Sequence, residues 1–175
     1  MTLRNESPAA PKSDWSLRRA DGVDAELIAA IFTSSRRAAM PYLPLLYTEL
    51  QVLEWIEDVV LRNSLVMLAV AYDRTGGFAS VQSGVLEHLY VSPQLQGHGL
   101  GALLLAAAKE ESPRGLRLHV FQRNLAARRF YERRGFKLVE LRDGSSNEEG
   151  EPDAVYEWIG AGRPRERTHE GLRAK

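Results

Sequence analysis

Apolar residues along this chain recur with either helical or strand spacing, and turn-forming residues separate the segments. Between Leu27 and Phe32 the spacing is helical and follows Asp21, a good N-cap. This helix is expected to end near Met40, because a proline comes next and disfavours helical geometry in the residue before it. A capping box at 48–51 opens a second helix, and helices are also predicted over 100–111 and 124–134.

Strands are predicted where short, β-rich runs are bounded by turn residues. The expected strands are 15–20, 65–72, 78–82, 86–91, 116–121, 136–141 and 154–159, with a hairpin turn at 73–77. In chain order the elements read βααβββαβαββ. This order predicts an α/β fold with a central mixed sheet flanked by helices.

The two ends of the chain differ from this pattern. Residues 1–14 are polar and contain prolines, and 160–175 have almost no apolar content. We therefore expect a flexible N-terminal arm, one folded domain over 15–159 and a disordered tail over 160–175.

The segment from Leu86 to Gly101 carries the clearest chemical signal. A β-rich run is followed by glycines at 97, 99 and 101, and then by an apolar helix. Glycines let backbone N–H groups approach an anion closely, and a helix N-terminus adds unsatisfied donors. The segment therefore predicts a site for a phosphate-bearing cofactor.

Other interpretations of the glycines fit less well. A Walker loop fails, because Gly101 is followed by Ala102 and Leu103 rather than Lys and Ser or Thr. A dinucleotide fingerprint fits Gly97, Gly99 and Ala102, but the expected ribose-binding acid is missing some 20 residues later. A simple glycine turn before a core helix explains three alternating glycines poorly.

Two blocks resemble the GNAT superfamily of N-acetyltransferases. Gln94-x-x-Gly97-x-Gly99, after Leu89-Tyr90-Val91, is similar to the coenzyme A signature, and the block from Asn124 to Phe136 is similar to the helix that follows it. The resemblance implies a GNAT fold and acetyl-CoA as co-substrate. It also implies that strand 86–91 parts from strand 116–121, so that the pantetheine arm pairs with the freed edge. The implied coenzyme-binding residues are Leu89, Tyr90, Val91, Gln96, Gly97, His98, Gly99, Leu100, Gly101 and Asn124.

The chain departs from this pattern at Gln96 and His98, where many relatives have arginine or lysine. Pyrophosphate binding is therefore expected to depend on backbone donors and the helix dipole. Asn124 is also a simple N-cap candidate. Tyr131 lies close to two turns after Asn124, and the family uses a tyrosine here to protonate the leaving thiolate. Periodicity alone equally allows Tyr131 to be a core residue.

Glu87 is the candidate general base. Strand alternation places it with Val85, Leu89 and Val91, an apolar set in which a carboxylate would be desolvated. A bulge would instead turn Glu87 to solvent. His88 and His119 are alternative bases, although each also fits a half-buried sheet position.

Composition narrows the function further. Formal net charge is zero, which gives no footprint for nucleic acid or an anionic membrane. There is no cysteine and there are only four scattered histidines, so no metal site is expected. No apolar run is long enough to span a membrane and no signal-peptide core is present, which favours a cytoplasmic protein.

Together these features predict an enzyme: an acyltransferase that moves an acetyl group from acetyl-CoA to a primary amine within a ternary complex. Five carboxylates in the loop 143–153 favour a small cationic acceptor, although that loop also fits a solvated hairpin tip. A peptide N-terminal acetyltransferase and a silent acyl-CoA-binding regulator are the alternatives. We expect a monomer or a homodimer.

Overall fold

The computed structural model describes residues 15–72 and 74–161, so the expected N-terminal arm and nearly all of the expected tail lie outside it. One seven-stranded mixed sheet runs through the described residues in the order β1-β2-β3-β4-β5-β7-β6. Its strands are β1 (Ser16–Arg19), β2 (Leu65–Ala71), β3 (Arg74–Gln82), β4 (Val85–Val91), β5 (Gly115–Phe121), β6 (Lys137–Leu141) and β7 (Asp153–Ile159). The predicted α/β class and element order are confirmed.

The helices also follow the predicted pattern. Asp21 forms a capping box with Asp24, a 3₁₀ turn follows, and α1 (Ala25–Ala39) ends at Met40. The predicted box at Thr48 and Gln51 opens α2 (Glu49–Trp55), which runs through a π turn at Ile56–Val60 into α3 (Leu61–Asn63). The last two helices are α4 (Leu100–Glu111) and α5 (Leu125–Glu132).

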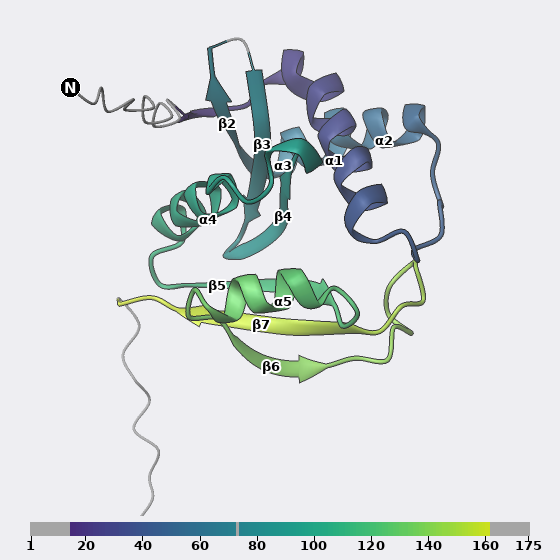
Figure 1. Cartoon of the computed structure of the whole chain (residues 1–175), viewed down its shortest axis with the longest axis vertical. Coiled ribbons are helices and arrows are strands. Elements are labelled where there is room, and N and C mark those ends of the chain that lie inside the picture. Colours follow the sequence, from purple (N-terminus) through teal and green to yellow (C-terminus); the bar gives the residue numbers. More distant parts are fainter. Residues whose placement is uncertain (1–14, 73, 162–175) are drawn as a thin grey trace, which may run out of the picture.

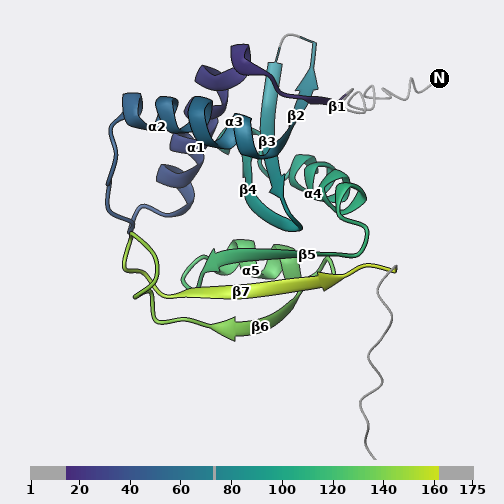
Figure 2. The same ribbon diagram turned by 180° about the vertical axis from the view of Figure 1, so that it is seen from behind.

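Helices cover both faces of the sheet and divide its core in two (Figure 1). On one face, apolar residues of α1 and α2 pack on β2 and β3 around Leu68 and Phe78. On the other face, α4 packs on β3, β4 and β5 around Leu104 and Leu118, and α5 adds Phe130 and Tyr131 to the same cluster. Figure 2 shows β5 and β7 in front of α5, so α5 covers one side of these two strands.

One predicted turn is wrong in its length. Residues 74–77 belong to β3 rather than to a loop, so the hairpin with β2 closes more tightly than predicted. Gly76 and Gly77 allow this, because a Cβ at Gly77 would lie 2.6 Å from the Tyr90 carbonyl oxygen. These glycines serve strand packing, which their turn propensity concealed.

The sheet opens between β4 and β5. The two strands run parallel and pair only at Val85 with Arg117 and at Leu86 with Leu118. Beyond this point β4 continues beside β3 while β5 continues beside β7, so the strands diverge into a gap. Within residues 15–72 and 74–161, no helix has the length and hydrophobicity needed to cross a membrane.

Candidate active site

The free edge of β4 faces the gap. The N–H of Ser92 donates to the Gly76 carbonyl on β3. Because backbone groups alternate along a strand, the backbone of Tyr90 also faces β3, and the backbones of Leu89 and Val91 face the gap. The Val91 carbonyl is already occupied, because it accepts hydrogen bonds from Ser35 Oγ (2.9 Å) and Gln96 Nε2 (3.2 Å). The groups that remain for an extended ligand are those of Leu89 and the N–H of Val91.

The glycine loop is shaped as an anion site. Gly97 and Gly99 adopt left-handed φ angles of 80° and 88°, and a Cβ at either would meet nothing within 4 Å. The first hydrogen bond of α4 runs from Leu103 N–H to the Gly99 carbonyl, which leaves the N–H groups just after Gly99 without helical partners. The loop therefore presents backbone donors at the positive end of α4 to open space.

Side chains in the loop hold its shape. Gln96 bonds back to Val91, and Nδ1 of the exposed His98 lies 2.9 Å from the Gln96 carbonyl oxygen. Leu100 is buried in the core. Gly101 differs from the other two glycines, because its absent side chain makes room for the Phe130 ring at 3.3 Å. Only Gly97 and Gly99 thus have the conformation that a close phosphate requires.

Two cavities meet at the gap. The glycine-loop cavity, of about 550 Å³, lies between the loop and α5 and is bordered by Gly97, Gly99, Ala102, Phe130 and Arg133 among others. The strand-gap cavity, of about 320 Å³, is bordered by Glu87, His119, Arg142, Asn147 and Asp153 among others. Six residues border both cavities: Met40, Leu89, Tyr90, Asn124, Ala127 and Tyr131.

Asn124 and Tyr131 lie together at this junction. Asn124 caps α5 by accepting a hydrogen bond from the Ala127 N–H at 3.1 Å. Tyr131 is only 8% exposed and packs edge-on against Phe130 and Phe136. Burial, with a smaller contribution from Tyr90, raises the pKa of Tyr131, so its hydroxyl stays protonated at neutral pH. Tyr131 is therefore a core residue that also borders both cavities, with its hydroxyl protonated.

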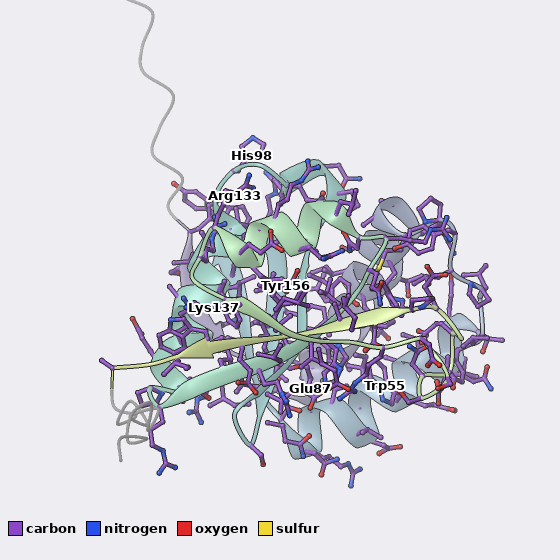
Figure 3. The ribbon with its side chains drawn as sticks, turned by 90° about the horizontal axis from the view of Figure 1, so that it is seen from below. Trp55, Glu87, His98, Arg133, Lys137 and Tyr156 are labelled. Atoms are coloured by element: carbon purple, nitrogen blue, oxygen red, sulfur yellow. The ribbon has the colours of Figure 1, made fainter. Side chains whose placement is uncertain are left out.

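Of the two interpretations of Glu87, burial on an apolar face is wrong and exposure at a bulge is confirmed. Ser80 pairs with His88 and Val81 pairs with Leu86, so Glu87 has no residue opposite it on β3 and forms a β-bulge. The bulge interrupts the alternation on which the prediction rested, and the Glu87 side chain is exposed. It still borders the strand-gap cavity, on the opposite side of β7 from His98 and Arg133 (Figure 3).

His88 is a structural residue. Its ring makes edge-on contacts with Phe32 and Trp55 at centroid distances of 5.9 and 5.1 Å. Burial lowers the pKa of His88 to about 4, with a smaller contribution from Arg36, so the ring is neutral near pH 7. It borders neither cavity.

His119 is placed differently. It lies on β5 at the strand-gap cavity with its side chain 43% exposed, and Nδ1 is 3.3 Å from Oδ2 of Asp153. Asp153 is the first residue of β7 and is 6% exposed. Sequence analysis grouped Asp153 with a polar loop, so its position beside His119 was missed. No local signal could have found it, because β5–β7 pairing makes the contact.

The carboxylates of the 143–153 loop are not free. Glu149 forms an ion pair of 2.6 Å with Arg36 of α1, and Glu148 Oε2 accepts a hydrogen bond of 2.5 Å from the Tyr47 hydroxyl. Glu151 lies 3.5 Å from Arg123. The Glu148 contact joins the β6–β7 loop to the α1–α2 connection, and these two segments run side by side in Figures 1 and 2. The Glu149 and Glu151 contacts join the loop to α1 and to the turn before α5. Three of the loop's carboxylates thus have partners within the protein.

The structure separates the arginines around α5. Arg128 donates to the Tyr156 hydroxyl and to the Gln122 carbonyl, and Arg123 stacks on Tyr42 beside Glu151. Arg133 and Arg134 border the glycine-loop cavity. Arg134 is held on the Phe130 ring and carbonyl, whereas Arg133 is exposed (Figure 3).

Known proteins share both the pattern and the fold. Residues 59–138 match the model of the acetyltransferase (GNAT) domain. The chain is 28% identical over 125 residues to the peptidyl-lysine N-acetyltransferase YjaB of Salmonella typhimurium, covering 71% of this chain and 84% of that protein. The solution structure of apo YjaB from Escherichia coli superposes with a TM-score of 0.70 at 24% identity, covering 84% of this chain and 99% of that one. YncA from Salmonella typhimurium, solved with acetyl-CoA, gives a TM-score of 0.63 at 21% identity, covering 84% and 94%.

The matched residues include both strands at the gap, the glycine loop and α5, while Met40, Arg142 and Asp153 border the cavities from outside the match. In sequence and in fold, the chain is therefore similar to the N-acetyltransferases of the GNAT superfamily, a class of acyltransferases.

Proposed function

We propose that this chain transfers an acetyl group from acetyl-CoA to a primary amine by direct attack within a ternary complex. The observation that carries the proposal is the junction of the two cavities. A thioester reaching the junction from the glycine-loop cavity would lie where an amine in the strand-gap cavity can attack it. Bringing the two reactants together in this way supplies a large part of the rate enhancement.

The glycine-loop cavity fits acetyl-CoA. The pyrophosphate would lie on the donors after Gly99, and the pantetheine amides would pair with Leu89 and with the N–H of Val91. Arg133 would supply the side-chain charge that the loop lacks at Gln96 and His98. The acetyl-CoA held by YncA supports this assignment.

Tyr131 would serve as the general acid. The tetrahedral intermediate collapses when the C–S bond breaks, and the leaving thiolate then needs a proton. Tyr131 borders both cavities, and its hydroxyl is protonated at neutral pH, the more firmly so because burial raises its pKa above the ordinary value.

The structure changes the argument for the acceptor. Glu148, Glu149 and Glu151 are engaged within the protein, so they give little support to a small cationic amine. The negative charge at the strand-gap cavity comes from Glu87 and Asp153 instead. A lysine side chain on a peptide, which is the acceptor named for YjaB, fits that charge as well.

Thermal unfolding with and without acetyl-CoA tests the coenzyme site. At about 100 times the dissociation constant, acetyl-CoA should add about 2.7 kcal/mol to the free energy of unfolding. Gly99→Val should abolish this gain, because the valine side chain would occupy the space that the phosphate needs and would strain the left-handed backbone at this position. Gly150→Val is the matched control, since Gly150 is also left-handed (φ 63°) with open space, but borders neither cavity.

The acceptor is tested by mass spectrometry of products from spermidine, an amino sugar, a lysine peptide blocked at its N-terminus, and a peptide with a free N-terminus. Acetylation of at least one amine is expected. If the wild type binds acetyl-CoA and acetylates none of them, the silent regulator is the better description.

A further inference from the structure

We propose that His119 is the general base of the transfer and that Asp153 is the positioning residue that holds its imidazole. This inference rests on the proposed function and deepens it. His119 and Asp153 lie on adjacent antiparallel strands, and both border the strand-gap cavity. Tyr131, the proposed acid, borders the same cavity from α5.

The geometry fixes which nitrogen of His119 is available. Asp153 Oδ2 lies 3.3 Å from Nδ1, so it accepts a hydrogen bond from the Nδ1–H tautomer. Nε2 then carries the lone pair, as a base requires, and an oriented imidazole of this kind is the usual partner of a buried carboxylate in catalysis. Because the side chain is 43% exposed, a proton taken by Nε2 can pass on to solvent.

Asp153 has a feature that a purely structural pair would not need. Its Oδ1 is buried and has no hydrogen-bond partner within the described residues, although the residue borders the cavity. Leaving a buried carboxylate oxygen without a partner is costly, and such an atom calls for an explanation. An ammonium or amine N–H of the acceptor, bound in the cavity, would supply the missing donor and lie beside His119.

A neighbouring pair on the same strands shows the contrast. Arg117 and Glu157 form an ion pair of 3.1 Å on the same face of β5 and β7, two residues from His119 along β5. That pair borders neither cavity. The two strands thus carry one pair outside the site and one pair at it, which provides a matched control.

The proton balance of the step is complete. The acceptor ammonium gives one proton to His119 Nε2 and becomes a neutral amine. The nitrogen then forms its bond to the acetyl carbon, loses a second proton, and the C–S bond breaks. The thiolate takes a proton from Tyr131, which the second proton replaces, and His119 releases its own to solvent. The net change is one amide, one free thiol and one proton.

The test uses the full chain with acetyl-CoA and two probe acceptors, spermidine and the N-terminally blocked lysine peptide, from pH 5.5 to 9. His119→Gln should lower kcat about 10²–10⁴-fold and remove the acidic limb of the pH profile, with KM for acetyl-CoA unchanged. Asp153→Asn should lower kcat about 10²-fold through misplacement of the ring. It should also remove the preference of neutral His119 for the Nδ1–H tautomer, which ¹⁵N NMR reads.

Other charges near His119 belong in the interpretation of that limb. The charged groups that face it from the packed elements are Arg117 on β5, Glu87 on β4, Glu140 and Arg142 at the end of β6, and Glu157 on β7. Glu157→Gln, the matched control, should leave kcat and the limb within about twofold. Glu87→Gln should leave the limb in place.

Three results would overturn the proposal. One is an acidic limb that persists in His119→Gln and disappears in Glu87→Gln. Another is Asp153→Asn with an unchanged kcat, in a variant whose folding matches the wild type by near-UV circular dichroism. The third is a ¹⁵N NMR spectrum of the wild type in which neutral His119 carries its proton on Nε2. A wild type that acetylates none of the four amines overturns the proposed function, on which the base role rests. The NMR signature then decides the pairing alone.

Discussion

Tyr131→Phe separates the packing role of Tyr131 in the core from its proposed role as the general acid. The substitution removes only the hydroxyl and keeps the ring, whose centroid lies 5.2 Å from that of Phe130 and 5.6 Å from that of Phe136. The packing around this ring is therefore retained. We expect the free energy of unfolding to change by no more than about 1 kcal/mol, and acetyl-CoA binding to be unchanged.

The expected kinetic effect is much larger than the effect on stability. Loss of a general acid lowers turnover about 10²–10⁴-fold, which corresponds to about 3–5 kcal/mol of activation free energy. Pre-steady-state release of coenzyme A measures it, because slow product release could hide a chemical step in steady-state rates.

Tyr156→Phe is the matched control for Tyr131→Phe. The Tyr156 hydroxyl donates to Glu132 Oε1 at 2.6 Å and accepts from Arg128 Nε at 3.0 Å, and it borders neither cavity. Its loss should reduce stability by about 1–3 kcal/mol and leave the chemical rate within about twofold. If Tyr131→Phe keeps the wild-type chemical rate, Tyr131 is a core residue only and the proposed acid is wrong.

Three further predictions concern His88, Glu149 and Arg133. The pKa of His88 is about 4 in the native state and about 6.5 in the unfolded chain, so lowering the pH through this window should reduce the free energy of unfolding by about 3 kcal/mol. His88→Phe should lose this pH dependence in urea titrations, and the same pH dependence in variant and wild type would contradict the prediction. Glu149→Gln leaves the largely buried Arg36 without its counter-ion and should lower the free energy of unfolding by about 1–3 kcal/mol, whereas an unchanged denaturation midpoint would show that the pair contributes nothing. Arg133→Ala should raise KM for acetyl-CoA about tenfold, because the pyrophosphate loses the side-chain charge that the loop lacks; Arg129→Ala is the control, and an unchanged KM in Arg133→Ala would refute the contact.

Local sequence determined most of the fold. The caps at Asp21, Thr48 and Asn124 act within three residues, so they could be predicted without knowing any tertiary contact. The glycine loop was predictable for the same reason, because left-handed φ angles at Gly97 and Gly99 follow from residue type and spacing. The element order, and with it the position of the gap in the sheet, came from these local signals together with the family resemblance.

The positions of the charged residues at and beside the strand-gap cavity were decided by tertiary structure alone. Alternation placed Glu87 on an apolar face, but the register of β3 against β4 turns it outward at a bulge. The charges of the 143–153 loop suggested a free surface, yet Glu149 pairs with Arg36 across 113 residues of chain. Asp153 meets His119 only because β7 returns beside β5. Each of these contacts joins segments far apart in sequence, and their energies depend on a register and a loop closure that no local window contains.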